Sequence, residues 1–138
     1  MPYSRFLFLN IGHSIDHLFM LMFPAVAALA AADLSASYGE VLRLATGSFI
    51  AFGVCSLPMG WLADRLSREF MMSVFFIGMG FSMILTGLAQ ETWQLVCTLT
   101  LMGVFAAIYH PVGLAMVSQG GGNVGRRLGV NGVWGNMG

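Results

Sequence analysis

The sequence predicts an all-α membrane protein, a polytopic bundle of transmembrane helices. Of its 138 residues, 57% are hydrophobic and only 9% are charged, whereas soluble domains carry about 25% charged residues. The apolar residues gather in runs of about 20 or more, the length that crosses a bilayer as a helix. These runs are continuous rather than alternating, which does not fit the strands of a membrane barrel.

The same composition excludes several classes of function. A chain with so few charges cannot cover the surface of a soluble enzyme or remain a disordered tail. The formal net charge is zero, so no basic surface is available for a nucleic acid. Cys55 and Cys97 lie in apolar runs and fit neither a disulfide framework nor a metal motif. We therefore expect no enzyme, no cofactor and no nucleic-acid partner.

The apolar runs define the expected spans. Their connections are short, so neighbouring spans should run antiparallel and pack as a series of helical hairpins. The last run reaches the C-terminus without a polar exit, and a half-inserted helix leaves carbonyls unsatisfied in lipid. We therefore interpret residues 1–138 as part of a larger membrane protein. The expected spans are residues 6–32, 44–63, 70–89 and 94–117, with a truncated fifth from 128.

Arginines predict the orientation of these spans. Five of the six arginines fall in segments expected on one side, and the opposite segments hold the sixth together with three acidic residues. Positively charged loops remain in the cytoplasm, so we expect a multi-pass protein of the inner or plasma membrane with a cytoplasmic N-terminus. Residues 90–93 should then lie outside and 120–127 inside. The five arginines are Arg5, Arg65, Arg68, Arg126 and Arg127.

A cleaved signal peptide is an alternative for the first run, which ends in three alanines. The run is longer than a typical signal sequence, and it contains Asn10, His13, Asp16 and His17. Such polar residues disrupt the apolar core of a signal peptide. A retained first span is therefore the expected outcome.

The connection between the second and third spans carries the most specific motif. Residues 60–69 read GWLADRLSRE. This resembles the signature loop of the major facilitator superfamily, Gly-x-Leu-Ala-Asp-Arg-x-Gly-Arg-Arg, which lies between the second and third of twelve spans. Here Ser67 replaces a glycine and Glu69 replaces a basic residue. The resemblance implies the N-terminal part of a twelve-span major facilitator fold, and its latch residues are Gly60, Asp64, Arg65 and Arg68.

Elementary electrostatics gives this loop a physical role. A carboxylate and guanidinium groups at helix ends can pair with one another and with a facing helix dipole. The resemblance places that facing helix in a C-terminal half of the same chain, beyond residue 138. The alternative is a loop whose positive charges only set the topology.

Polar side chains on the first span share one face. At about 100° per residue, Asn10, His13, Asp16 and His17 fall within about one third of the helix surface. A rise of 1.5 Å per residue places Asp16 roughly 16 Å from Arg5, near the bilayer midplane. Ionisable residues at that depth usually face a bundle interior or a cavity. The polar side chains on this face can relay protons. Alternatively, they form a structural network that holds helices together.

The fourth span contains a second polar site. Pro111 leaves a carbonyl unbonded four residues earlier, and a bent, polar segment tends to line a cavity. We expect Tyr109, His110 and Pro111 to contribute to that cavity. His110 and His13 each lie about 12 Å from the cytoplasmic side, so they should face one another if the first and fourth spans touch. The alternative is a simple kink whose histidine finds its partners locally.

A narrower resemblance is to the fosmidomycin-resistance-like branch of the superfamily. It rests on GHSID at 12–16, YHP at 109–111 and NGVWGNMG at 131–138. That branch has Ser-His-x-x-Asn/Asp, Phe-His-Pro-Glu and Gln-Val-Gly-Gly-Asn-x-Gly in the same order. Val112 stands where the branch has glutamate, so any role of that glutamate is missing here. The basic residue that many drug/proton antiporters carry in the fourth span is also missing.

These features predict a secondary active transporter. The superfamily resemblance implies proton-coupled efflux of a small molecule, as an antiporter, by alternating access, in a lipid bilayer and with protons as partners. Two alternatives remain: a small four-span transporter that works as an oligomer, and a non-transporting membrane scaffold or sensor. The spacing of His13 and His17 also fits a pair of metal ligands, but without a closing cysteine we expect no metal site.

Overall fold

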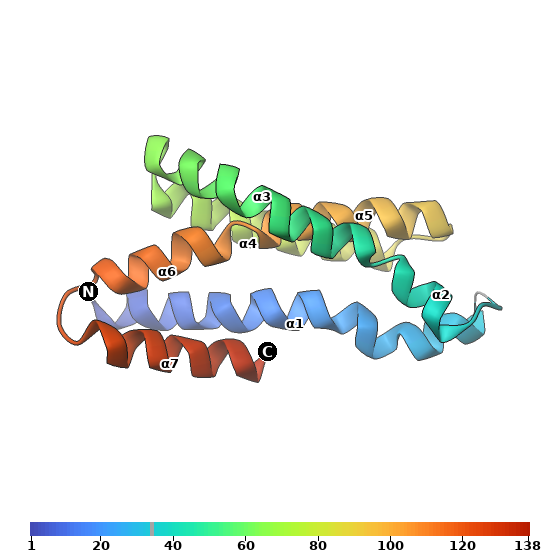
Figure 1. The fold of residues 1–138 in the computed structure, drawn as a ribbon, viewed down its shortest axis with the longest axis horizontal. Helices are drawn as coiled ribbons and strands as arrows, with labels where there is room; N and C mark the ends of the chain where they lie inside the picture. The colour runs from blue at the N-terminus through green and yellow to red at the C-terminus, as the bar shows by residue number, and fades with distance from the viewer. Residues whose placement is uncertain (34) are drawn as a thin grey trace.

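The computed structural model describes residues 1–33 and 35–138, and within these residues the chain is helical without strands. The view in Figure 1 shows long helices that lie roughly side by side along one axis. The all-α prediction is therefore confirmed. The helices are α1 (Tyr3–Asp33), α2 (Tyr38–Arg43), α3 (Thr46–Arg65), α4 (Arg68–Gly87), α5 (Thr92–Ala106), α6 (Tyr109–Gln119) and α7 (Val124–Met137).

Local side-chain caps fix where several helices begin. Ser37 and Glu40 form a reciprocal capping box at the start of α2, which satisfies two otherwise free backbone N–H groups. The Ser67 hydroxyl accepts from a backbone N–H in the first turn of α4, and the Asn123 side chain does the same for α7. Just before α7, Gly121 has a φ of 76°, a left-handed conformation that favours glycine.

The fourth expected span, residues 94–117, is divided between α5 and α6. The backbone turns at Ala107 and Ile108, and Pro111 is the third residue of α6. Proline has no N–H to donate to the carbonyl of Ala107, so the helix cannot continue regularly through this point. The bend expected from Pro111 is thus a break between two helices.

Four helical segments among the described residues are long and apolar enough to cross a membrane. They lie near the expected spans, although the second also includes α2 and starts earlier than residue 44. The bounds of these segments are Tyr3–Asp33, Tyr38–Arg65, Arg68–Gly87 and Thr92–Gln119. The assignment of residues 1–138 to an N-terminal transporter domain stays a prediction.

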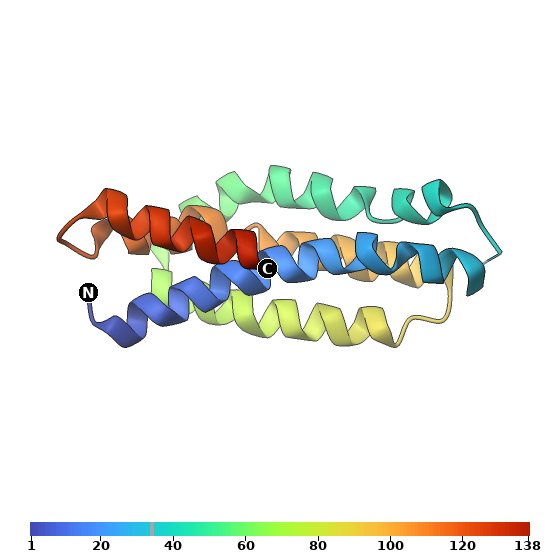
Figure 2. The ribbon, with the colours of Figure 1, turned by 90° about the horizontal axis from the view of Figure 1, so that it is seen from below.

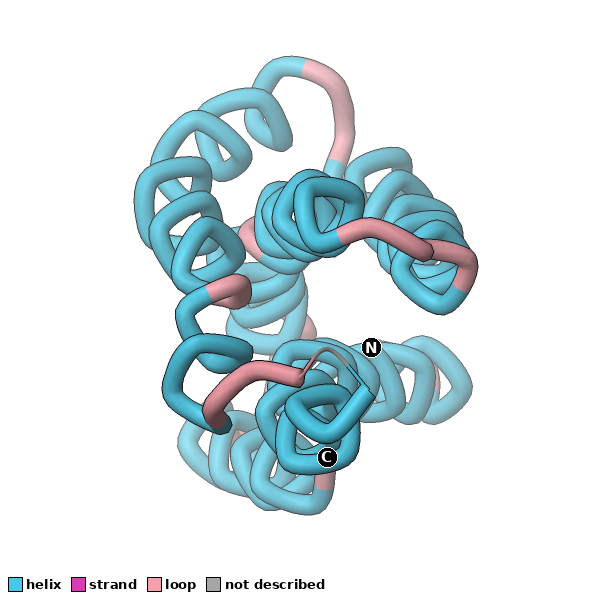
Figure 3. The backbone as a smooth tube through the Cα atoms, turned by 90° about the vertical axis from the view of Figure 1, so that its right-hand side faces the viewer, coloured by secondary structure: helices cyan, strands magenta, loops and turns pink. Residues whose placement is uncertain are grey.

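The helices pack as two neighbouring groups, which the end-on view in Figure 3 separates most clearly. In one group α3 and α4 both pack against α5, and in the other α7 lies beside the first half of α1. Figures 1 and 2 show that α1 and α7 run in the same direction, from the end that holds the N-terminus. Helix α6 contacts α1, α3, α4 and α7, so it joins the two groups.

Glycines allow close contact between α3 and α5. A Cβ added at Gly103 of α5 would overlap the backbone of Ser48 in α3, and one added at Gly47 would overlap the side chain of Thr100. Small residues let helix backbones approach in this way, which is how helices associate in lipid. Larger side chains fill the space further along, including the fully buried Phe75 and Tyr109.

The two ends of the bundle differ in charge. The N-terminus, the turn from α3 to α4 and the loop from α6 to α7 lie at one end (Figure 1), and they hold five of the six arginines. The other end holds Arg43 with Asp33, Glu40 and Glu91. The chain path therefore places the segments on the two sides as the arginine pattern requires.

Candidate functional site

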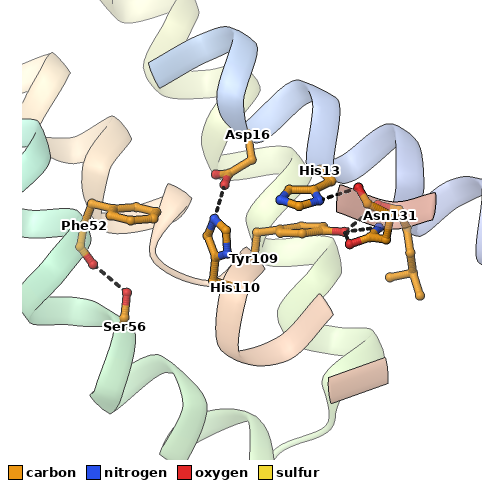
Figure 4. A network of polar contacts seen from close by, with 8 residues as sticks. His13, Asp16, Phe52, Ser56, Tyr109, His110 and Asn131 are labelled. Carbon is orange, nitrogen blue, oxygen red and sulfur yellow. Dashed lines mark hydrogen bonds and ion pairs between the residues drawn. The ribbon is translucent and has the colours of Figure 1, made fainter. Parts of the chain in front are cut away.

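A buried carboxylate from the first span meets a partly exposed imidazole from the fourth. His110 Nε2, at the start of α6, lies 3.4 Å from Asp16 Oδ2 on α1. Figure 4 shows the two side chains pointing toward one another. Asp16 is only 1% exposed and is the one buried carboxylate among the described residues. This contact crosses between two spans whose polar residues the sequence singled out separately.

The three histidines of the chain gather around this contact. The ring centroid of His13 lies 4.9 Å from that of His17 and 5.3 Å from that of His110, and His17 lies 5.7 Å from His110. All three pairs meet edge to face. The sequence contains three histidines, so every imidazole in the chain belongs to this one cluster, which we call the histidine cluster (His13, His17 and His110).

A layer of hydrogen bonds lies beside the histidine cluster. The Tyr109 hydroxyl donates to the carbonyl of Leu9 at 2.7 Å, and Asn131 Nδ2 donates to Asn10 Oδ1 at 2.9 Å and to the Tyr109 hydroxyl at 3.0 Å. Asn10, Tyr109 and Asn131 are all buried. This network ties α1, α6 and α7 together and stacks the Tyr109 ring on His13, with centroids 4.8 Å apart.

His13 connects the two layers. Its Nδ1 lies 2.8 Å from the backbone carbonyl of Asn131, and a carbonyl can only accept a hydrogen bond. Nδ1 therefore carries a hydrogen, and in a neutral ring Nε2 is left with a free lone pair. Figure 4 shows that second nitrogen on the side of Asp16 and His110.

A cavity of about 200 Å³ opens onto the site from the side of α3. Asp16, His17 and His110 supply its polar wall, and Phe49 and Phe52 supply much of its apolar wall. The Phe52 ring meets the His110 ring edge on, with centroids 5.5 Å apart. The Asp16 carboxylate therefore borders a small cavity whose other walls are mostly apolar.

The expected latch residues lie together at the end of the bundle that carries most arginines. Arg68 Nη2 is 3.1 Å from Asp64 Oδ1, and the other guanidinium nitrogen of Arg68 donates to Gln119 Oε1 at the end of α6. Arg65 instead lies over the Trp61 ring, 3.9 Å from its centroid. The loop therefore binds to α6 through Arg68.

Glu69, which departs from the signature, has its own partner. Its carboxylate pairs with Arg5 at the start of α1. The N-terminal amine also donates to the carbonyl of Gly120, at 2.7 Å. These contacts surround a pocket of about 520 Å³ lined by residues of α1, α3, α4 and α6. The reversed charge at position 69 thus joins the loop to the first span.

The structure brings most of the predicted residues into two groups, the interior site and the signature loop. Asn10, His13, Asp16, His17, Tyr109 and His110 line or border the interior site. Gly60 belongs to the loop motif but contacts the fourth span, because a Cβ added there would lie 3.1 Å from the Pro111 side chain. Asn131 was noted only as part of the motif at 131–138, and neither Asn131 nor Phe52 was predicted as a site residue.

A family model and several curated proteins match this chain. The family model described as "Major Facilitator Superfamily" matches residues 9–138. A protein named "Multidrug resistance protein MdtG" from Escherichia coli O1:K1 / APEC is 39% identical over 72 residues, which is 52% of this chain and 18% of that relative. The protein of the same name from Escherichia coli strain K12 / DH10B matches equally well. No solved structure gives a significant match.

Most of the chain is therefore covered by one family. The chain spans less than a fifth of the curated relatives it matches, and the narrower resemblance to the fosmidomycin-resistance-like branch stays a prediction. The family match instead covers nearly the whole helical bundle, including the interior site and the signature loop. The chain belongs to the major facilitator superfamily.

Proposed function

We propose that this chain forms the N-terminal spans of a proton-coupled transporter that exports a small molecule from the cell by alternating access. Family membership supports a membrane transporter, and the name of the MdtG relatives supports efflux. The match to less than a fifth of those relatives supports a longer bundle in which a C-terminal half completes the substrate cavity. The bundle would lie in the inner or plasma membrane with a cytoplasmic N-terminus.

The contact between Asp16 and His110 carries the proposal. A buried carboxylate is costly in a membrane unless it is protonated or paired, and here its partner is an imidazole, which can also carry a proton. A proton can therefore be held by either group. Because Asp16 is on α1 and His110 is on α6, movement between these helices changes how the proton is shared.

The cavity provides the link to conformation. Opening it to one side brings water to Asp16 and favours release of the proton, and closing it favours retention. His17 would take part in this exchange, with His13 and Asn10 as neighbours and with Tyr109 and Pro111 setting the position of His110. A carrier that opens alternately to two sides would then exchange protons as it exchanges substrate.

The test is transport by proteoliposomes with and without an imposed pH gradient, with ethidium as the first fluorescent probe among a panel of lipophilic drugs. Asp16→Asn keeps the size of the side chain but cannot ionise, so gradient-driven accumulation should fall to background. Asp33→Asn, an exposed position on the same helix, is the matched control and should behave as the native protein.

Two outcomes would contradict the proposal. Gradient-dependent accumulation that persists in Asp16→Asn would show that protons travel through another residue. A native protein that moves no member of the panel, with or without a gradient, would favour the scaffold or sensor alternative.

A further inference from the structure

We propose that the histidine cluster is a binding site for a transition-metal dication of the Zn²⁺, Co²⁺ and Ni²⁺ class, with the Asp16 carboxylate beside it. The sequence alone suggested only a pair, His13 and His17, without a closing cysteine. The fold supplies the third imidazole from a helix almost 100 residues further along the chain. This site is additional to proton coupling, because a metal can bind here whether or not the protein transports protons.

The separations fit a metal site. One ligand nitrogen from each of His13, His17 and His110 lies within 4.8 Å of the others. Tetrahedral zinc with bonds of about 2.0–2.1 Å holds its ligand atoms roughly 3.3 Å apart. Each nitrogen would need to move inward by less than about 1 Å, which small side-chain rotations within their rotamer wells can provide.

The hydrogen-bond pattern prepares His13 as a ligand. Its Nδ1–H donates to the carbonyl of Asn131 at 2.8 Å, so the lone pair of a neutral ring is on Nε2. Metal-binding histidines typically donate their second ring N–H to a carbonyl or carboxylate in this way, which fixes the tautomer and orients the ring. Asn131 therefore acts as the outer support of the site.

Several polar atoms of the site have no partner within the described residues. His13 Nε2, His17 Nε2 and Asp16 Oδ1 are buried and accept no hydrogen bond from the described chain. The side chains of His13 and Asp16 are more than nine-tenths buried. Buried polar atoms are normally satisfied, and a cation held by the cluster would satisfy the two imidazole nitrogens and compensate the nearby carboxylate charge.

The donor set selects the kind of cation. Imidazole nitrogens suit zinc, cobalt, nickel and copper, whereas magnesium and calcium require oxygen ligands in larger number. One carboxylate offsets half the charge of a dication, which lowers the cost of placing it among transmembrane helices. The cavity bordered by Asp16, His17 and His110 gives the ion a route to the cluster.

The experiment is a titration of the protein in detergent with Co²⁺. The protein is purified through an affinity tag that contains no histidine. Tetrahedral Co²⁺ absorbs strongly in the visible region, whereas the hydrated octahedral ion absorbs weakly. We expect a saturable visible band at one Co²⁺ per chain, and we expect added Zn²⁺ to displace it.

Variants assign the site. His17→Ala and His110→Ala should each weaken Co²⁺ binding by about tenfold or more. Even the loss of a residue that only hydrogen-bonds to a metal ligand typically lowers metal affinity about 10–100-fold. Asp16→Asn should weaken binding while leaving the three imidazoles in place. Cys55→Ala and Cys97→Ala are the controls, because cysteine is the other strong zinc ligand in the sequence, and neither should change the titration.

Several results would overturn the proposal. A native protein without a saturable visible band has no such site. A band that survives in the His17→Ala, His110→Ala double variant, or that is lost in the cysteine variants, places the metal elsewhere. Size-exclusion chromatography of each variant shows that loss of the band reflects the site and not loss of the fold.

Discussion

The position of the His13 ring depends on a residue that has no side chain. Gly135 of α7 packs directly against the imidazole, and a Cβ added there would lie 2.6–2.9 Å from three of its ring atoms. The same ring is held from another side by the stacked Tyr109. A single methyl group on α7 is therefore expected to displace His13, although α7 contributes no titratable group to the cluster.

Gly135→Ala tests this dependence. We expect weaker Co²⁺ binding by roughly tenfold and reduced gradient-driven transport, because the His13 ring must move away from its neighbours. Gly132→Ala is the matched control, since a Cβ there meets nothing within 4 Å. Both changes favour the helix equally. Equal metal binding in the two variants would show that Gly135 does not position His13.

Residue patterns in the sequence predicted only part of this site. The polar face of the first span and the Tyr-His-Pro segment were visible because charged and polar residues are rare in apolar runs. Asn131 was not predicted as a site residue because its partner Asn10 lies 121 positions away. The fifth run begins with several glycines and has no distinct polar and apolar faces. Its sequence therefore does not predict which face of α7 packs against α1.

At the scale of helices, the contact between α3 and α5 depends on Gly103. Replacing it with leucine would force the side chain into the backbone of Ser48. Overpacking of this kind costs about 1–3 kcal/mol, so Gly103→Leu should lower the unfolding temperature in detergent. Gly53→Leu on α3 is the control, because a Cβ at Gly53 meets nothing within 4 Å. Similar unfolding temperatures for the two variants would contradict tight packing at Gly103.

The loop between α3 and α4 gives a second prediction at this scale. Asp64→Asn removes the charge partner of Arg68. The Asp64 side chain is 69% exposed, and pairs this exposed contribute little to stability, about 0–1 kcal/mol. We therefore expect an unchanged unfolding temperature but a lower transport rate, because the latch biases one conformation over the other. Transport at the native rate, at matched expression and with Asp33→Asn as control, would rule out the latch.

Helix boundaries were predictable where composition changes sharply. Ser67 and Asn123, which cap α4 and α7, are residue types favoured at helix starts, and the helices begin two and four residues before the expected spans at 70 and 128. The turn at Ala107 and Ile108 was anticipated only as a bend, since the sequence marks a proline but does not tell how neighbouring helices respond to the freed carbonyl. The extension of the second segment to α2 was also not predicted, because Tyr38–Arg43 carries two charges, Glu40 and Arg43, within six residues.

At the scale of the whole molecule, the arginine distribution predicts the orientation in the membrane. Single cysteines in a background without Cys55 and Cys97 would test it, with labelling by a membrane-impermeant maleimide on intact cells. A cysteine at Glu91 should react from outside, and one at Val124, at the opposite end of the bundle, should react only after permeabilisation. The reverse pattern would mean that the N-terminus is not cytoplasmic.

The break between α5 and α6 allows α6 to rotate about its first residues, so that a small movement there becomes a larger one at its far end. Helix α6 has 11 residues and is therefore roughly 16 Å long, with His110 beside the pivot and Gln119 at the far end. A rotation of about 10° would move His110 by well under 1 Å and Gln119 by about 3 Å. A hydrogen bond does not survive a displacement of that size, so the contact between Gln119 and Arg68 would open. A small adjustment of His110 around a proton or a metal ion would thus be accompanied by a larger displacement at the far end of α6. That displacement would release the loop that contains Asp64.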